Sequence, residues 1–442
     1  MRLPRYLPAF SLVVLCTACG AADRSASDGA GSAVAAAIDT VGGIERLAYP
    51  GTGGPRLAWS FDTVAIIGEA FGTEEYQFDR VTAAGLAGDA DGNVYVLDLA
   101  GSRVLKYGPD GRYLGSWGRE GGGPAELGRP VALALGPGDT LWVADSRNRR
   151  YTGFPIHGGE PRTVRIDGSL GNPTGGLTVR EHGFLQSYTP PPLSRLQQVI
   201  GRARSGIDLP EPERRIPLRF LSLTGESVAT PWLAPEPPMR LVTVSGGVTI
   251  GVRRAFRPRF RWAQLSDGTV VVSDTAEYVL HLVRPDGARV RSFGRDLPAR
   301  AVTEADREAE RERLISQGGS IAASALELAG AMIARGGGSG RAPSLPSRSE
   351  LAEEEARAME FEPVIPRVVG IVVDRADRIW VGISLDRPDT VERVDIFDRD
   401  GRLLGELTSA ILPDAFTGSD HALVLRRDEL DVQQVVVMRI RT

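Results

Sequence analysis

Cysteine is almost absent from this chain of 442 residues, because its two cysteines, Cys16 and Cys19, both lie within the first 20 residues. Once a leader is removed before Cys19, the body of the protein has no disulfide and its stability depends on packing. Histidine is scarce as well. The four histidines are His157, His182, His281 and His421. They share no repeat position and no metal-ligand spacing, so we expect no zinc site.

Several signatures of catalysis and nucleic-acid binding are also missing. The sequence contains no G-x-S-x-G nucleophile motif and no phosphate-binding P-loop. Its formal net charge is −4, and no basic stripe stands out. We therefore expect no catalytic residue, no metal, no other cofactor and no nucleic-acid partner.

The first 18 residues have the features of a secretory signal peptide. Arg2 and Arg5 supply positive charge, and the apolar stretch from Leu7 to Leu15 is too short to cross a bilayer as a helix. The residues that follow, CTACG, resemble a bacterial lipobox, in which the chain is cleaved before a cysteine whose sulfur then carries lipid. This resemblance implies a signal peptide over 1–18 and a lipidated Cys19, with an ordinary cleaved signal as the alternative.

Two neighbours of Cys19 bear on this interpretation. Cys16 stands in the third position before Cys19, where the lipobox has leucine. Gly20, in place of aspartate, resembles the pattern that permits export to the outer membrane. We therefore expect an exported protein, held by its lipid at the cell envelope on the outer membrane and facing the periplasm. Residues 19–55 then comprise the lipidated cysteine and a flexible tether of small polar residues.

Turn-forming residues are abundant, because the chain contains 53 glycines and 30 prolines. The stretch from Asp89 to Gly118, DADGNVYVLDLAGSRVLKYGPDGRYLGSWG, reads as three strands joined by Asp-Gly turns, the strongest short-range hairpin signal. Such a meander cannot bury its own apolar faces and needs neighbours of the same kind. The chain supplies them: apolar strands ending at Asp98 and Asp145 lie 47 residues apart, near the period of a propeller blade.

Three phrases resemble the NHL-type repeats of six-bladed β-propellers: GNVYVLDLAGSRVLKYGPDGRYLGSWG, RPVALALGPGDTLWVADSRNRR and GTVVVSDTAEYVLHLVRPDGARVRSFG. The resemblance is good over 80–167 and moderate over 259–294 and 367–407. It implies an all-β fold, a six-bladed β-propeller of four-stranded antiparallel blades that covers 56–442. It is specific for architecture and says little about activity.

The repeats predict where the blades lie. The expected ranges are about 80–118 for blade one, 128–167 for blade two, 172–230 for blade three with an interruption at 190–213, 257–294 for blade four and 364–407 for blade five. The strands between 240 and 253 fit either the outer part of blade three or a separate pair. The last strands, 416–441, need a partner, and we expect Arg56–Glu69 to pair with Val432–Arg441 and close the ring.

The period-two pattern breaks between blades four and five. Thr303 followed by Asp306 is a helix-start signature, and it predicts a helix from Thr303 to Arg335. A second, acidic helix is expected from Ser349. This helical insert of about 303–362 is either a pair packed on one rim or a lid or partner-docking element.

Asp98, Asp145 and Asp274 occupy one position of the repeat, directly after an apolar strand. They could form a ring of carboxylates that binds a metal in the channel, as in gluconolactonase-type propellers, or each could accept backbone N–H bonds in its turn. Repetition favours the structural role, since a turn recurs in every blade and a site usually does not. Asp89 to Asn93 resembles a calcium loop but has glycine in the fourth position instead of the sixth, so we predict a hairpin turn.

Four arginines lie just before the innermost strand of a blade: Arg80, Arg129, Arg259 and Arg367. In a propeller these positions gather around one mouth of the axial channel. Four guanidinium groups there would create a positive field suited to a carboxylate or phosphate ligand. The alternative is that they are solvated and paired with neighbouring acids, such as Asp79 beside Arg80.

These features predict a non-catalytic ligand- or protein-binding β-propeller module anchored at the bacterial cell envelope. Its partner would be a protein or a small anionic ligand, and it would meet the membrane through the N-terminal lipid. The alternative is a metal-dependent lactonase or hydrolase-type propeller enzyme with its site in the axial channel. A third hypothesis is an architectural envelope protein whose helices dock a partner.

Overall fold

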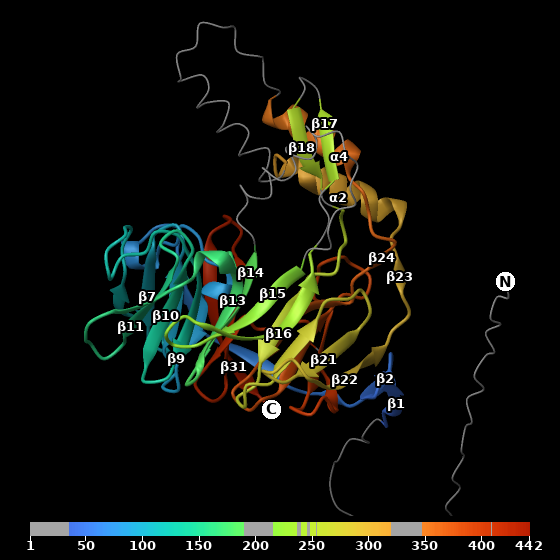
Figure 1. Cartoon of the computed structure of the whole chain (residues 1–442), viewed down its shortest axis with the longest axis horizontal. Helices are drawn as coiled ribbons and strands as arrows, with labels where there is room; N and C mark the ends of the chain where they lie inside the picture. Colours follow the sequence, from blue (N-terminus) through green and yellow to red (C-terminus); the bar gives the residue numbers. More distant parts are fainter. Residues whose placement is uncertain are drawn as a thin grey trace, which may run out of the picture. The chain divides into compact units, whose positions relative to one another are not determined.

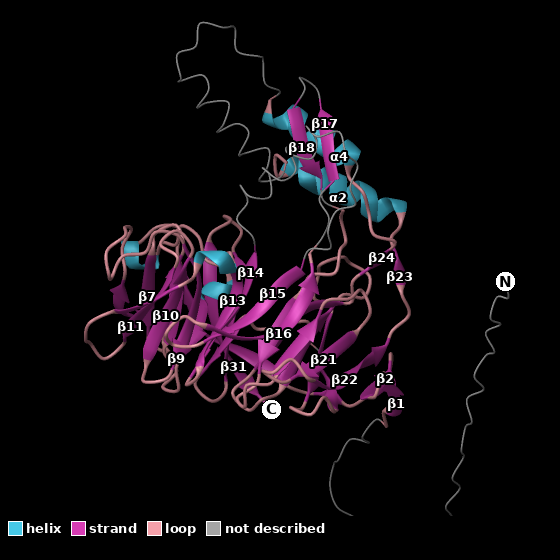
Figure 2. Ribbon diagram, in the orientation of Figure 1, coloured by secondary structure: helices cyan, strands magenta, loops and turns pink. Residues whose placement is uncertain are grey.

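The computed structural model describes residues 35–189, 215–236, 240–244, 248–252, 254–319, 347–407 and 409–442. Strands dominate these residues, and there are two α-helices among them (Figures 1 and 2). The expected signal peptide, Cys19 and the interruption at 190–213 lie outside the described residues. Among the helices that can be described, neither has the length and apolar character to cross a membrane.

Six sheets form the blades of a six-bladed β-propeller, which confirms the predicted fold class. Within each blade the strands are antiparallel, and the first strands of several neighbouring blades contact one another. Blade one has β5 (Leu86–Gly88), β6 (Val94–Asp98), β7 (Arg103–Tyr107) and β8 (Tyr113–Trp117); blade two has β9 (Pro130–Gly136), β10 (Thr140–Asp145), β11 (Arg150–Pro155) and β12 (Arg162–Arg165); blade three has β13 (Asn172–Arg180), β14 (Gly183–Thr189), β15 (Arg215–Leu221) and β16 (Ser227–Pro235).

The second half of the ring repeats this order. Blade four has β19 (Arg261–Gln264), β20 (Val270–Ser273), β21 (Val279–Val283) and β22 (Arg289–Asp296); blade five has β25 (Val368–Val373), β26 (Ile379–Ile383), β27 (Arg393–Phe397) and β28 (Leu403–Leu407); blade six has β29 (Ala415–Thr417), β30 (His421–Arg427), β31 (Gln433–Arg441) and β4 (Ser60–Ile67). Three short 3-10 helices lie in the connections: η1 (Glu74–Tyr76), η2 (Ala83–Gly85) and η3 (Gly168–Leu170).

The N-terminal strands run along the outer edges of three blades in succession. Strand β2 (Ile44–Pro50), which forms a hairpin with β1 (Ala37–Val41), lies parallel to β22, and β3 (Arg56–Leu57) lies parallel to β28. Strand β4 then pairs antiparallel with β31, which confirms the predicted closure of the ring. The expected tether is too long, because residues 37–50 form strands. The reason is that Leu47 and Tyr49 are buried in the core between blades four and five.

Two insertions form a small substructure that we call the insert module. It comprises the hairpin of β17 (Arg240–Val244) and β18 (Val248–Val252), which is a separate strand pair, and the helices α2 (Glu304–Ser316) and α4 (Arg348–Ala358), which contact each other. Helix α4 contacts both strands. Both helices lie between blades four and five, as predicted. The short pair β23 (Arg300–Ala301) and β24 (Val364–Ile365) joins the two ends of this insertion.

The predicted start of the first helix is correct and its predicted end is not. The side chain of Thr303 accepts from the Asp306 backbone N–H, and Asp306 accepts from the Thr303 N–H at 2.8 Å. Helix α2 ends at Ser316 because Gly318 and Gly319 follow with positive φ, a conformation that terminates helices. Residues 320–335, which were expected to continue it, lie outside the described residues.

A glycine in the turn between the third and fourth strands contacts the preceding blade at four places: Gly111, Gly225, Gly287 and Gly401. A Cβ atom at Gly225 would lie 2.3 Å from the carbonyl oxygen of Arg165, and one at Gly401 would lie 2.7 Å from the ring of Phe293. Both glycines have positive φ, near 89° and 79°. The repeated turn therefore needs glycine for its conformation and for its close approach to the preceding blade.

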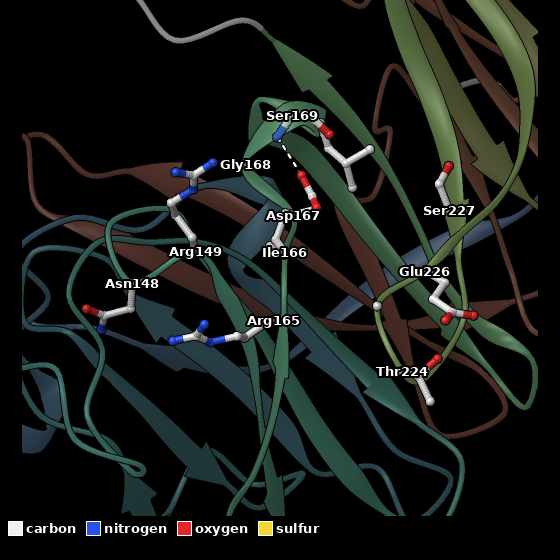
Figure 3. A pocket seen from close by; sticks show the side chains of 12 residues that line it. Asn148, Arg149, Arg165, Ile166, Asp167, Gly168, Ser169, Thr224, Glu226 and Ser227 are labelled. Atoms are coloured by element: carbon white, nitrogen blue, oxygen red, sulfur yellow. Dashed lines mark hydrogen bonds between the residues drawn. The ribbon is translucent and has the colours of Figure 1, made fainter.

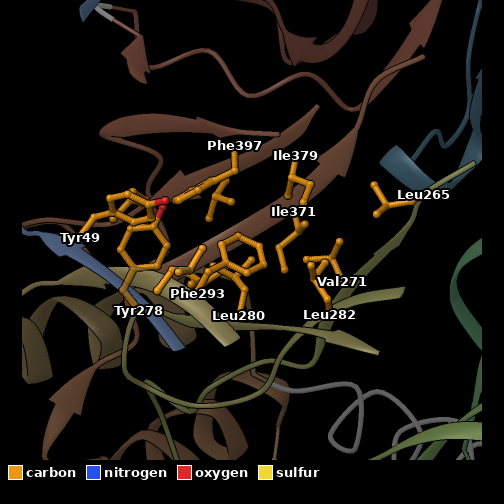
Figure 4. Close-up of a cluster of buried hydrophobic side chains, with 14 residues drawn as sticks. Tyr49, Leu265, Val271, Tyr278, Leu280, Leu282, Phe293, Ile371, Ile379 and Phe397 are labelled. Atoms are coloured by element: carbon orange, nitrogen blue, oxygen red, sulfur yellow. The ribbon is translucent and has the colours of Figure 1, made fainter. Parts of the chain in front are cut away.

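The apolar core lies between the blades instead of at a single centre. Between blades four and five, Tyr49, Tyr278, Phe293 and Phe397 pack together (Figure 4), and the Phe293 and Phe397 rings meet edge to face with centroids 5.0 Å apart. The Tyr278 hydroxyl donates to Asp395 at 2.9 Å. Each interface of this kind holds only two neighbouring blades, so the ring is stable only when every interface is made.

A buried ionic network lies beside this core and involves the N-terminal strands. Arg295 and Asp395 are fully buried and lie 3.1 Å apart, and Arg295 also donates to Glu406 at 3.1 Å. The remaining N–H groups of Arg295 donate to the carbonyl oxygens of Pro50 at 2.8 Å and Gly53 at 2.6 Å. Burial raises the pKa of Asp395, against the opposing effect of Arg393 and Arg295. The segment that contains Pro50 and Gly53 is thus needed to satisfy a buried charge.

We expect two truncations to separate these roles. A chain that starts at residue 59 keeps β4, so it should retain one cooperative thermal transition, with a lower Tm because Arg295 loses the Pro50 and Gly53 carbonyls. A chain that starts at residue 69 also loses β4 and leaves β31 as an open edge. It should lose the cooperative transition and aggregate. Circular dichroism melts and size-exclusion chromatography measure both effects, and an unchanged melt of the shorter chain would refute the closure.

Candidate functional site

Two of the repeated aspartates anchor the backbone that leads into their own blade. Asp145 is fully buried and accepts from the backbone N–H groups of Gly128 at 2.8 Å and Arg129 at 2.9 Å, and from the Asn148 side chain at 2.7 Å. Asp98 does the same in blade one, accepting from the Arg80 N–H at 3.0 Å. Both carboxylates thus accept from backbone N–H groups before their blade, which agrees with the structural role that repetition favours, and Asp98 also lies 3.5 Å from the Arg103 guanidinium.

Other aspartates of the repeat have different partners. Asp274 accepts from the indole N–H of Trp232 at 2.9 Å instead of from backbone. Asp89 accepts from the N–H groups of Asp91 and Asn93, so the stretch is the predicted hairpin turn. Asp89 also accepts from the Tyr95 hydroxyl at 2.9 Å. Each of these carboxylates is thus occupied by donors of the protein itself.

The four arginines expected at the channel mouth have different surroundings. The backbone register is shared, since the carbonyl groups of Arg80, Arg129 and Arg367 each accept from the N–H group that follows the second strand of their blade. Arg80 and Arg129 have exposed side chains. Arg259 forms an exposed ion pair with Asp389 at 3.0 Å, which is the alternative considered for these residues.

Arg367 does not offer its guanidinium to a ligand. It is 6% exposed, and it donates to the carbonyl oxygens of Ser384 at 3.2 Å, Leu385 at 2.6 Å and Pro298. Burial lowers the pKa of Arg367. Its role is structural because three peptide dipoles already surround the charge, so a four-arginine ligand site at the mouth is not assembled.

The histidines are dispersed. His157 contacts Asp139 at 3.2 Å, His281 contacts Ser292 at 2.8 Å, and His421 contacts Asp420 at 2.9 Å. Within the described residues, no group of three or more histidine, cysteine, aspartate or glutamate side chains is arranged to hold a metal.

A cleft of about 780 Å³ lies between blades two and three (Figure 3). One wall comes from the turn before β11, the end of β12 and η3, and the other comes from the turn before β16. The lining is mostly polar: Asn148, Arg149, Arg165, Ile166, Asp167, Gly168, Ser169, Leu170, Thr224, Gly225, Glu226 and Ser227.

Two arginines stand on the same wall of this cleft. Strand pairing places Arg150 opposite Arg165, and the Arg149 carbonyl accepts from the Ile166 N–H at 2.8 Å, so Arg149 and Arg165 come together. A Cβ atom at Gly168 would lie 1.9 Å from a guanidinium nitrogen of Arg149, so that group packs directly on the glycine backbone. Figure 3 shows both guanidinium groups on one side of the cleft.

Neither guanidinium is engaged in a hydrogen bond or salt bridge with any part of the chain that the structure describes. Asp167 lies near them, and hydrogen bonds from Ser169 lower the pKa of its carboxyl group, with a further effect from Arg149. Across the cleft are the Glu226 carboxylate and the hydroxyl groups of Thr224 and Ser227 (Figure 3). The arrangement can bind an acidic group at the arginines and hydroxyl or amino groups at the opposite wall.

Sequence reasoning missed this pair of arginines. Arg149 belongs to the run Ser146-Arg-Asn-Arg-Arg150 and Arg165 ends a strand 16 positions later, so the two look unrelated. The hairpin register of blade two would have brought them together. The opposite wall lies in the turn between β15 and β16, where Gly225 contacts the Arg165 backbone as the other repeated turn glycines contact their preceding blades.

No protein-family model and no curated protein matches the chain. Among solved structures, virginiamycin B lyase from Staphylococcus aureus is similar with a TM-score of 0.34 and 9% identity, over 86% of this chain and 99% of that one. A Bacteroides fragilis protein described as exported has a TM-score of 0.40 and 8% identity, over 87% and 95%. A gluconolactonase from Xanthomonas campestris has a TM-score of 0.33 and 16% identity, over 93% and 99%. Likenesses at this level carry no argument about activity.

The structural role of the strand-end aspartates has a measurable consequence. Asp145→Ala leaves several buried N–H donors without an acceptor, and we expect it to lower the free energy of unfolding by about 3 kcal/mol. Glu160→Ala, which removes an exposed carboxylate in the same blade, is the control and should change the free energy of unfolding little. Urea unfolding measures both. A calcium-dependent rise in the Tm of the wild type that is absent from Asp145→Ala would instead support a metal ring.

Proposed function

We propose that this chain is an exported NHL-type β-propeller that binds a ligand without catalysis and is anchored at the bacterial cell envelope through lipid on Cys19. Its ligand is a small molecule with a carboxylate or phosphate group, and the cleft between blades two and three is the binding site.

The binding site is inferred from Arg149 and Arg165, whose guanidinium groups make no hydrogen bond or salt bridge with the described residues. Two guanidinium groups face one cleft of about 780 Å³, and neither is neutralised by a hydrogen-bonded carboxylate among the described residues. Arginine presents a planar set of donors that matches carboxylate and phosphate groups in bidentate fashion. The turn of Gly225, which reaches the Arg165 backbone, fixes the opposite wall beside them.

The test titrates the mature protein with citrate and with inorganic phosphate by isothermal titration calorimetry. In Arg149→Gln/Arg165→Gln we expect the affinity for citrate to fall by at least about tenfold, because each lost charge-assisted hydrogen bond contributes roughly 1.5–3 kcal/mol. Arg112→Gln/Arg162→Gln removes the same charge from exposed positions outside the cleft and is the matched control. Equal affinity in the cleft variant and the wild type would place the site elsewhere.

The membrane anchor has a separate test. Cys19→Ser removes the sulfur that accepts the lipid, so in a bacterial host we expect the protein to lose its label from radioactive palmitate and to leave the membrane fraction. Cys16→Ser is the matched control and should keep both. Release of both variants from the membrane to the same extent would favour an ordinary cleaved signal.

The metal-dependent hydrolase is the second candidate, and one residue bears on it. Asp414 directly precedes β29, the innermost strand of blade six, and accepts from the Leu425 N–H at 2.7 Å. Burial raises the pKa of Asp414 to about 6. A carboxyl group that titrates near neutral pH at an innermost strand has the acidity of a general acid or base.

A further inference from the structure

The cleft between blades two and three has both signs of charge, on opposite walls. Arg149 and Arg165 stand on the wall of blade two, and the Glu226 carboxylate stands on the wall of blade three (Figure 3). None of these three side chains forms a hydrogen bond or salt bridge with the described residues. One cleft therefore holds charges of opposite sign that are not paired with each other, and a ligand can pair with both.

The position of Glu226 follows from the turn to which it belongs. Gly225, directly before it, has a positive φ of 89°, and a Cβ atom at Gly225 would lie 2.3 Å from the Arg165 carbonyl oxygen. Within the turn, the Glu226 N–H donates to the Ser222 hydroxyl at 3.2 Å, and the Glu226 carbonyl accepts from the Ser222 N–H at 2.9 Å. The turn thus packs on the strand that ends in Arg165, so the backbone of Glu226 has a fixed position beside that strand.

The charges that line the cleft cancel, because its two arginines are balanced by Glu226 and Asp167. Asp167 already accepts from the Ser169 N–H at 2.7 Å, so Glu226 is the carboxylate that remains open to a ligand. A ligand with negative charge alone gains at the arginines but is repelled by the acids. A ligand that has both a carboxylate and an ammonium group gains at both walls.

The surroundings of Glu226 suit an ammonium group. Thr224 and Ser227 lie on the same wall and add two hydroxyl groups (Figure 3). An ammonium group has three N–H donors, so it can donate to the carboxylate and to a hydroxyl oxygen at the same time. The cleft volume of about 780 Å³ is within the range of pockets that hold drug-sized ligands, so a short peptide has room in it.

We propose that the cleft binds a zwitterion, an amino acid or short peptide, with its carboxylate at Arg149 and Arg165 and its ammonium group at Glu226. This proposal rests on the proposed function of the cleft as an anion site and adds the second charged group of the ligand. It follows from unpaired charges of opposite sign on the two walls of one cleft. The two guanidinium groups supply paired donors for the carboxylate, and Glu226 accepts from the ammonium group.

The experiment compares trialanine with N-acetyl-trialanine, which keeps the carboxylate and lacks the ammonium group, by isothermal titration calorimetry of the mature protein at pH 7. We expect the wild type to bind trialanine more tightly than its acetylated form. Glu226→Gln should weaken trialanine binding by roughly three- to fivefold, the loss expected for an ion pair at an exposed site. The same substitution should strengthen citrate binding by about twofold, because it removes a like charge. Opposite effects on the two ligands cannot come from a loss of folding.

Two controls make the outcome specific. Glu160→Gln removes an exposed carboxylate from the connection between β11 and β12, and it should bind trialanine and citrate as the wild type does. L-Alanine separates the two sources of a zwitterion, since tighter binding of trialanine assigns a peptide, and equal or tighter binding of L-alanine assigns an amino acid.

The proposal is overturned if Glu226→Gln binds trialanine as the wild type does, or if the wild type binds trialanine no more tightly than N-acetyl-trialanine. In either case, citrate binding that is lost in Arg149→Gln/Arg165→Gln would leave the cleft as an anion site. Loss of the anion site itself would show instead as equal citrate affinity of that double variant and the wild type, so the two failures are distinguishable.

Discussion

The pairing of β4 with β31 is the interaction on which the rest of the molecule depends. A propeller has no core that all blades share, because each blade packs only on its neighbours. A ring with one missing strand would expose an open sheet edge and weaken the packing on both sides of the gap. The N-terminal segment supplies that strand, and on the way it adds β2 to blade four and β3 to blade five. Closure therefore couples the N-terminal strands to half of the ring.

The dependence of the ring on its N-terminal segment also explains where charged side chains are buried. Arg295 and Asp395 lie between blades four and five, and the carbonyl groups of Pro50 and Gly53 complete the coordination of the guanidinium. A buried pair gains little unless its remaining donors are satisfied. The route of the N-terminal segment along the blade edges is thus favoured by packing of Tyr49 and by these hydrogen bonds together. Such a segment behaves as part of the domain, although its sequence is close to that of a tether.

A contact could be predicted from the sequence where it recurs from blade to blade, and could not be predicted where it occurs only once. The Asp-Gly turns, the strand-end aspartates and the Thr303 helix cap are local signals, and they predicted the blades and the start of α2 correctly. The sequence also predicted the backbone position that the arginines share, but it did not predict the contacts of their guanidinium groups. Arg259 meets Asp389 and Arg367 meets Pro298, residues that belong to insertions or loops without repeat equivalents. A repeat pattern predicts backbone position, whereas side-chain partners depend on the irregular loops.

The exposure of Arg149 and Arg165 bears on how the cleft would bind an anion. Arg149 and Arg165 are exposed on an open cleft, where water and salt screen charge over about 8 Å at physiological ionic strength. Affinity at the cleft should therefore depend on shape and on the Glu226 wall as much as on charge. Added sodium chloride should weaken the part of that affinity that comes from the two guanidinium charges.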